Sequence, residues 1–214
     1  MYVEFVANAS FWMLLLAIDR KLFETARASA CSFCGGRLHV SHYARKPRGL
    51  PVEAEGYFSQ RFSCCCGRCR KRNTPVSVRF LGRRVYVAAI MILATMHALV
   101  CGAARRTLGR WDVWWTQTVP TLGFWRELQG RLVPTVDNAR LPGSLLERLE
   151  PQKDLQTEDC LVQVLKFMAP ATTSTGRSRL FEGRSGVLVF AQKMPLEPKR
   201  RDPLCGSRAL IDST

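Results

Sequence analysis

The chain has 214 residues, of which 47% are hydrophobic, so it can bury a core as one mid-sized domain or as two small ones. Its formal net charge of +15 at pH 7 indicates a polyanionic partner, either nucleic acid or an anionic lipid surface. Its nine cysteines are an odd number, which argues against a fully disulfide-paired secreted scaffold.

The positive charge is concentrated between Cys31 and Arg84, where twelve Lys and Arg residues are opposed by only two acids, Glu53 and Glu55. This segment therefore carries ten of the fifteen net charges. Residues 137–159 are acidic by contrast. We expect the two halves of the chain to have different roles.

Residues 3–30 are predicted to form a helix, because apolar residues recur from Phe5 to Phe23 and good helix formers follow. The apolar run FWMLLLAI within this segment is too short to span a bilayer. Glu4 stands where a secretory signal would carry basic residues, and no convincing cleavage site follows the run. We therefore expect a reducing, cytoplasmic compartment, in which clustered cysteines more often bind metal than form disulfides.

Residues 31–80 contain three short β-like segments, RLHVSHY, YFSQRFS and VSVRF, separated by GG, KPRG and NTP turns. Pro47, Gly49 and Pro51 mark an extended basic loop between the first two. We expect a small β module here rather than a helical one.

Residues 85–104 are nearly all apolar, and two interpretations of them are open. The length matches a membrane span. Thr95, His97, the helix-weakening Gly102 and basic residues at both ends favour a buried core helix instead.

Residues 99–116, LVCGAARRTLGRWDVWWT, are consistent with a helix end, a turn and a new helix that starts near Ala103, as in a helix-turn-helix. Leu108, Trp111 and Trp115 would then pack in the core, whether the segment binds DNA or is an ordinary amphipathic helix. Further helices are predicted over 122–129, 141–149 and 155–169. Residues 171–214 are predicted to be a mostly flexible basic tail, with VLVF at 187–190 as its one candidate strand.

Two Cys-x-x-Cys pairs predict a metal site. Cys31 and Cys34 lie in CSFCGG, and Cys66 and Cys69 lie in CGRC, with a spacer of 31 residues between the pairs. Two residues between cysteines let a tight turn direct both thiolates to one ion, and a nearby glycine permits the left-handed backbone of such a turn. Four thiolates form the closed tetrahedral site of structural zinc, which leaves no open position for a catalytic water.

Neighbouring residues leave alternatives for the ligand set. Cys66 is the preferred ligand because its spacing to Cys69 matches the first pair, and Cys65 is the alternative, with Cys64 also feasible. His39 and His42 are interpreted as structural or solvent-exposed residues, since one ion already has four ligands.

The cations near the cysteine pairs and in the predicted second helix are the candidate phosphate contacts, because rigidly held cations neutralise phosphates and release counterions. The predicted nucleic-acid-binding residues are Arg45, Lys46, Arg48, Arg68, Arg70, Lys71, Arg72, Arg105, Arg106 and Arg110.

The motifs CSFCGG and RFSCCCGRCRKRNTP, followed by VRFLGRR, resemble the N-terminal zinc-ribbon module of bacterial insertion-sequence transposases. RRTLGRW is similar to the second helix of their helix-turn-helix units, so the resemblance covers residues 31–116. In that family the ribbon binds DNA ends, and the matching zinc ligands are Cys31, Cys34, Cys66 and Cys69.

This chain departs from the family after Trp115. Such transposases continue into an RNase H-like domain in which three acids hold two metal ions, and no series of strands follows here to carry such acids. Asp112, Asp137 and Asp159 are therefore interpreted as surface residues, and no catalytic residue is predicted.

The sequence thus predicts an α+β protein with four parts: an N-terminal helix (1–30), a basic zinc-ribbon module (31–84), a helical domain with a helix-turn-helix (85–170) and a basic tail (171–214). The predicted function is zinc-dependent DNA binding, transposase-like and non-catalytic by itself. The alternatives are a single-pass membrane protein that spans 85–104 and carries a cytosolic zinc ribbon, and a zinc-ribbon adaptor for protein partners.

Overall fold

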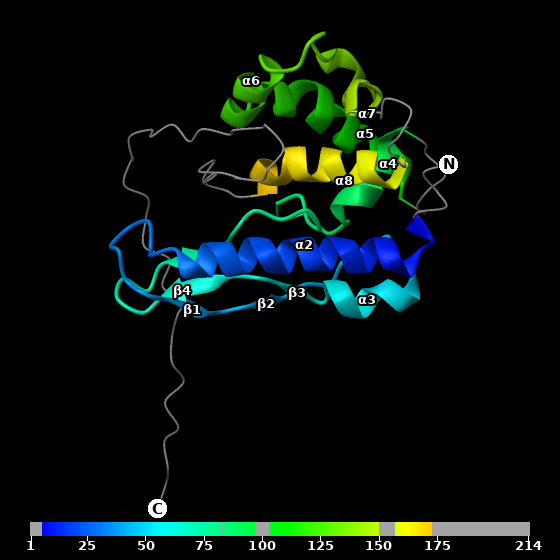
Figure 1. The fold of residues 1–214 in the computed structure, drawn as a ribbon. Coiled ribbons are helices and arrows are strands. Elements are labelled where there is room, and N and C mark those ends of the chain that lie inside the picture. The colour runs from blue at the N-terminus through cyan, green and yellow to red at the C-terminus, as the bar shows by residue number, and fades with distance from the viewer. Residues whose placement is uncertain (1–5, 83, 97–102, 150–156, 173–214) are drawn as a thin grey trace, which may run out of the picture.

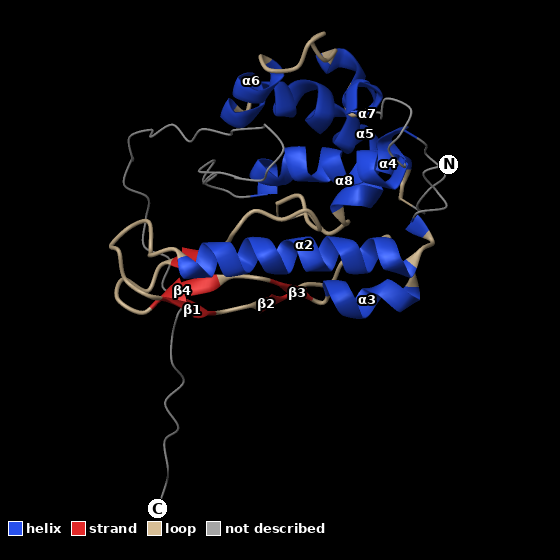
Figure 2. Cartoon of the chain, in the orientation of Figure 1, coloured by secondary structure: helices blue, strands red, loops and turns tan. Residues whose placement is uncertain are grey.

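The computed structural model describes residues 6–82, 84–96, 103–149 and 157–172. Helices and two small antiparallel sheets make up this part of the chain, which confirms the α+β class. Helix α2 (Ala9–Ala28) lies between the strands on one side and the helices α4 to α8 on the other (Figures 1 and 2).

Helix α2 lies within the predicted range 3–30, and its N-terminal cap explains where it starts. The side chain of Asn8 accepts a hydrogen bond from the Ser10 N–H (2.9 Å), which satisfies one backbone donor of the first turn. Its buried positions recur at helical spacing, so one face packs against the rest of the protein. These residues are Phe11, Trp12, Leu15, Asp19 and Phe23.

The strands form two sheets with antiparallel pairing. The three-stranded sheet has the order β1-β4-β5, with Leu38 opposite Cys66 and Val40 opposite Cys64. The two-stranded sheet pairs β2 with β3. The strand bounds are β1 Leu38–Val40, β2 Tyr43–Ala44, β3 Gln60–Arg61, β4 Cys64–Cys66 and β5 Arg72–Asn73.

The prediction for 31–80 is wrong in two places. Val52–Phe58 forms a helix, α3, which includes the first two residues of the predicted strand YFSQRFS. The segment VSVRF joins neither sheet, and only Phe80 makes an isolated bridge, to Val87. Its residues from Ser77 to Phe80 are nonetheless buried, so other groups must satisfy its backbone.

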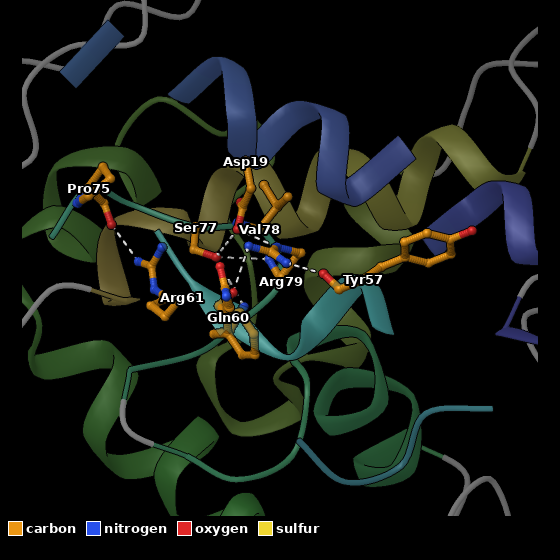
Figure 3. Close-up of polar contacts among 9 residues, drawn as sticks. Asp19, Tyr57, Gln60, Arg61, Pro75, Ser77, Val78 and Arg79 are labelled. Carbon is orange, nitrogen blue, oxygen red and sulfur yellow. Dashed lines mark hydrogen bonds and ion pairs between the residues drawn. The ribbon is translucent and has the colours of Figure 1, made fainter. Parts of the chain in front are cut away.

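The buried Asp19 carboxylate, which accepts the Val78 N–H, and the Ser77 hydroxyl, which accepts the N–H groups of Arg79 and Phe80, supply those bonds (Figure 3). Asp19 on α2 accepts hydrogen bonds from the Ser77 hydroxyl (2.6 Å), the Val78 N–H (2.7 Å) and the Arg79 Nε–H (2.8 Å). Arg79 also donates to the carbonyls of Tyr57 and Gln60, so it ties α3 to the same network. Burial lowers the pKa of Arg79, and the Asp19 carboxylate opposes that shift.

Helices α4 to α8, together with α2, contribute most of the main hydrophobic core. Residues Ala88–Ala94 of α4 are all buried there, as predicted for a core helix. Within the described residues, none of the helices has the length and apolar character needed to cross a membrane. Residues 97–102 of the segment 85–104 lie outside the description.

The remaining helical elements follow the predicted positions closely. Their bounds are α4 Ala88–Met96, α5 Arg105–Val113, a π-helix Trp114–Thr118, a 3₁₀-helix Val119–Thr121, α6 Gly123–Gln129, a 3₁₀-helix Asn138–Arg140, α7 Gly143–Leu149, α8 Thr157–Met168 and a 3₁₀-helix Ala169–Thr172. The last of these includes residues 171 and 172, which were predicted to begin the tail. The rest of that tail, with the predicted strand 187–190, lies outside the described residues.

Candidate metal centre

Four cysteine sulfurs lie together beside the three-stranded sheet. The Sγ atoms of Cys31, Cys34, Cys66 and Cys69 are all within 4.8 Å of one another. The Cys31–Cys69 distance is 3.7 Å and the Cys34–Cys66 distance is 3.5 Å. A tetrahedron with bonds of about 2.3 Å has ligands about 3.8 Å apart, so these sulfurs are close to the spacing that one bound ion needs. All four cysteines are free thiols rather than disulfides.

The first knuckle, residues 31–36, is closed by two backbone hydrogen bonds. The Gly35 N–H donates to the Cys31 carbonyl (2.8 Å), and the Cys31 N–H donates to the Gly36 carbonyl (2.9 Å). Gly35 has a φ of +71°, as predicted for the glycine that follows the cysteine pair.

The second knuckle, residues 66–71, repeats this pattern. The Arg70 N–H donates to the Cys66 carbonyl (3.0 Å), and the Cys66 N–H donates to the Lys71 carbonyl (3.0 Å). Here the left-handed residue is Arg70, with a φ of +59°, and not the glycine inside the turn. The two segments, distant in sequence, therefore present their cysteines with the same local geometry.

The structure shows which of the three adjacent cysteines belongs to the cluster. Cys66 belongs to the cluster, as preferred from its spacing. Because side chains alternate along a strand, Cys65 on β4 points away from the cluster and its thiol contacts the Arg70 carbonyl (3.3 Å) instead. Cys64 is buried, and this burial raises the pKa of its thiol. Neither alternative ligand is part of the site.

Two glycines allow the knuckles to approach each other and the sheet. A Cβ at position 36 would lie 2.9 Å from the Arg68 Cβ and 3.0 Å from the Cys66 sulfur, so any other residue would push the knuckles apart. A Cβ at position 67 would lie 2.9 Å from the His39 Nε2. A side chain at position 67 would therefore require the exposed His39 ring to move.

The thiols of the cluster differ in acidity. The Cys69 N–H, 3.5 Å from the Cys66 sulfur, lowers the pKa of the Cys66 thiol to about 6. The Lys71 N–H acts to lower the pKa of Cys69, but lost hydration and the neighbouring thiols outweigh it and raise that pKa to about 12. The Cys66 thiolate thus forms readily, whereas deprotonation of the Cys69 thiol is opposed by its neighbours. A divalent cation would remove this conflict by replacing the protons.

A small second hydrophobic core packs against the cysteine cluster. Phe23, at the C-terminal end of α2, packs with Leu38 and with cysteines of the site. The His42 ring packs edge-to-face against Phe23 and in a tilted arrangement against Phe62, at centroid distances of 4.8 and 5.0 Å, and its Nδ1 accepts the Ser63 N–H. His42 is therefore structural, and no histidine among the described residues joins the cysteine cluster.

The predicted phosphate contacts fall into two groups. Arg45 donates to the Arg84 carbonyl (2.5 Å), and Arg72 donates to the Ser41 carbonyl (2.8 Å) and lies over the Tyr43 ring. Hydrogen bonds to backbone carbonyls within the protein thus fix these two guanidinium groups. The other members, Lys46, Arg48, Arg68, Arg70, Lys71, Arg105, Arg106 and Arg110, are exposed, as is Arg72 itself.

One exposed side chain at this site was missed by the sequence analysis. Phe33, between the first two ligands, is 42% exposed, and the Lys71 ammonium lies 4.1 Å from the centroid of its ring. The signal was an aromatic residue inside a Cys-x-x-Cys turn, where side chains of the turn face outward.

Comparisons of this chain with protein-family models, with curated proteins and with solved structures find no match. Function is therefore inferred from the geometry of the site.

Proposed function

We propose that this protein binds DNA through a module held together by structural zinc, and that it is transposase-like but non-catalytic by itself. The observation that carries the proposal is the cluster of four cysteine sulfurs, presented by two equivalent knuckles, the second of which also bears exposed cations.

Zinc is the proposed ion because four thiolates in a tetrahedral arrangement are the donor set that it prefers in structural sites. Cys31, Cys34, Cys66 and Cys69 would fill all four positions, which leaves none for a substrate or a reactive water. In a chain that binds zinc this way, much of the binding free energy stabilises the fold.

A zinc ribbon is the proposed form of the module. Two knuckles beside the antiparallel sheet β1-β4-β5 support this assignment, since the second knuckle links β4 to β5 directly. Leu38 opposite Cys66 fixes the first strand to the ligand-bearing strand. The resemblance to transposase ribbons rests on the same residues.

DNA is the proposed partner because the exposed cations of the module have few acidic neighbours along the chain. Residues 56–111 contain no Asp or Glu at all. Arg68, Arg70 and Lys71 extend from a turn that a bound ion would hold rigid. Cations fixed in this way lose little side-chain freedom when they bind phosphates.

A second contact region is proposed on α5, as the recognition helix of a helix-turn-helix. Helices α4 and α5 contact each other, although the residues between them, 97–102, lie outside the described part. Trp111 and Trp115 are buried, as the core side of such a helix requires. Arg105, Arg106 and Arg110 are exposed on the other side.

The test combines metal analysis with a salt titration of binding to random-sequence duplex DNA. We expect about one zinc per chain, loss of binding when a chelator removes it, and a log affinity that falls linearly with log salt. Tight DNA binding by protein without zinc would contradict the proposal.

Matched charge variants locate the contacts. Arg68→Gln should weaken duplex binding and lower the salt slope by about 0.9, because one phosphate contact is lost. Arg126→Gln removes a cation on α6 that is also exposed and serves as the control. Equal losses for both variants would show that only net charge matters, and not the module.

A further inference from the structure

The tip of the first knuckle exposes an aromatic ring where a buried one would be expected. Phe33 lies between two ligand cysteines and is 42% exposed, whereas every other Phe and Trp side chain in the described part is buried or half-buried. The turn that carries it is fixed by two backbone hydrogen bonds, so the ring is held on a rigid support. The Lys71 ammonium lies over the ring, and the part of the ring that is still exposed is available for a ligand to cover.

The surroundings of this ring are positively charged. The Lys71 ammonium lies 4.1 Å from the ring centroid. Arg68 starts beside the first knuckle, since its Cβ lies 2.9 Å from the point where a Cβ on Gly36 would be. Arg70, at the left-handed position of the second knuckle, is also exposed. An aromatic face surrounded by cations matches a flat, uncharged ring that is flanked by phosphates.

A nucleotide with an unpaired base has this chemistry. A base can stack on an aromatic side chain only when its face is free, while the bases of a duplex are already stacked on each other. Cations beside the ring then neutralise the phosphates on either side of the base. Duplex DNA could use the cations of the module but not the ring.

We propose that Phe33 is a stacking platform for unpaired bases of single-stranded DNA, and that Lys71, Arg68 and Arg70 bind the adjacent phosphates. This inference rests on the proposed DNA-binding function and adds a preference for unpaired strands at the zinc knuckles. It assigns the exposed cations of α5 to a different, duplex-contacting region.

The experiment compares two aromatic-to-leucine variants of the zinc-loaded full chain. Phe33→Leu removes the proposed platform, and Tyr57→Leu removes an aromatic ring of similar exposure, 37%, on α3. Affinity is measured by fluorescence anisotropy with a short oligo(dT) strand, a duplex of the same length and the corresponding oligo(rU). Zinc content and circular dichroism verify that each variant is folded.

We expect Phe33→Leu to weaken binding to oligo(dT) by about 10-fold, because the stacking of one base on the ring is lost, and to change duplex binding by less than about 2-fold. Tyr57→Leu should leave both affinities unchanged. Phe33→Trp should retain or strengthen binding to oligo(dT), since an indole is also a stacking surface.

Three outcomes would overturn the inference while leaving the proposed function intact: an unchanged oligo(dT) affinity in Phe33→Leu, an equal loss for strand and duplex, or tighter binding of oligo(rU) than of oligo(dT). A fourth outcome would also overturn it: if the unmodified chain bound vesicles that contain anionic lipid and Phe33→Leu did not, the ring would be assigned to a membrane surface. If no nucleic acid binds at all, the proposed function itself fails.

Discussion

Replacing Asp19 by Asn is expected to destabilise the protein strongly. The Asp19 carboxylate and the Arg79 guanidinium are 0% and 1% exposed and 2.8 Å apart, so each charge depends on the other. Asn has nearly the same shape but leaves the Arg79 charge without a counterion and presents an amide to three hydrogen-bond donors. Breaking one partner of a buried pair costs about 3–5 kcal/mol, and we expect a loss in this range.

Urea unfolding followed by tryptophan fluorescence measures this loss, with zinc present in excess in every sample. Glu147→Gln is the matched control, because it breaks the Arg140–Glu147 pair, whose side chains are 61% and 56% exposed. An exposed pair contributes at most about 1 kcal/mol. If D19N lost no more stability than Glu147→Gln, Arg79 would not require a buried counterion and our account of the network would be refuted.

The remaining predictions concern the metal centre. Cys66→Ser should abolish stoichiometric zinc binding while Cys65→Ser retains it, as measured by metal analysis after dialysis; the opposite result would reassign the ligand. Gly36→Ala should lower zinc affinity, because its Cβ would lie 3.0 Å from the Cys66 sulfur. Gly56→Ala is the control and should not lower it, because its Cβ would meet no atom within 4 Å. Competition with a chromogenic chelator measures zinc affinity in both variants. Zinc should be released as the pH falls, because protons compete with the ion for the four thiolates. We expect release below about 6, where even the Cys66 thiol, whose pKa is lowered to about 6, is protonated in the metal-free protein. Release unaffected by pH between neutrality and strong acid would contradict thiolate ligation.

The cysteine cluster could be predicted because the spacing within each cysteine pair can be read from a few adjacent residues. Two residues between cysteines fix a turn, and the equal spacing in both pairs selected Cys66 before any contact was known. The long helices could be predicted for a similar reason, since apolar residues at helical spacing determine which face is buried. In both cases, the decisive residues lie within a few positions of one another.

The buried network could not be predicted, because its partners are far apart in the sequence. Asp19 lies on a helix next to Arg20 and Lys21 and has the local signature of a surface acid. Its partner Arg79 is 60 residues away. The alternation in VSVRF indicated a strand, but the Asp19 carboxylate takes the backbone bond that a neighbouring strand would otherwise make.

Helix α3 was missed for a different reason. Basic, Pro- and Gly-containing residues precede it, and they favoured a loop throughout this segment. The signal that could have identified it is Pro51 followed by Glu53 and Glu55 in the first turn, where acids interact favourably with the helix dipole.

The ion pair and the metal centre close two loops of the chain, one inside the other. Asp19 and Arg79 are 60 positions apart, and the cysteines at 31 and 69, which are 38 apart, lie between them. Once the inner loop is closed, only roughly 22 free residues remain in the outer one, so closing it costs about 0.9 kcal/mol less in chain entropy. As the chain folds, an ion bound at the knuckles should therefore lower the cost of forming a salt bridge that it does not touch, and the ion pair should lower the cost of closing the cysteine loop to the same extent. The order in which the loops close thus links ion binding at the two knuckles to formation of the Asp19–Arg79 pair.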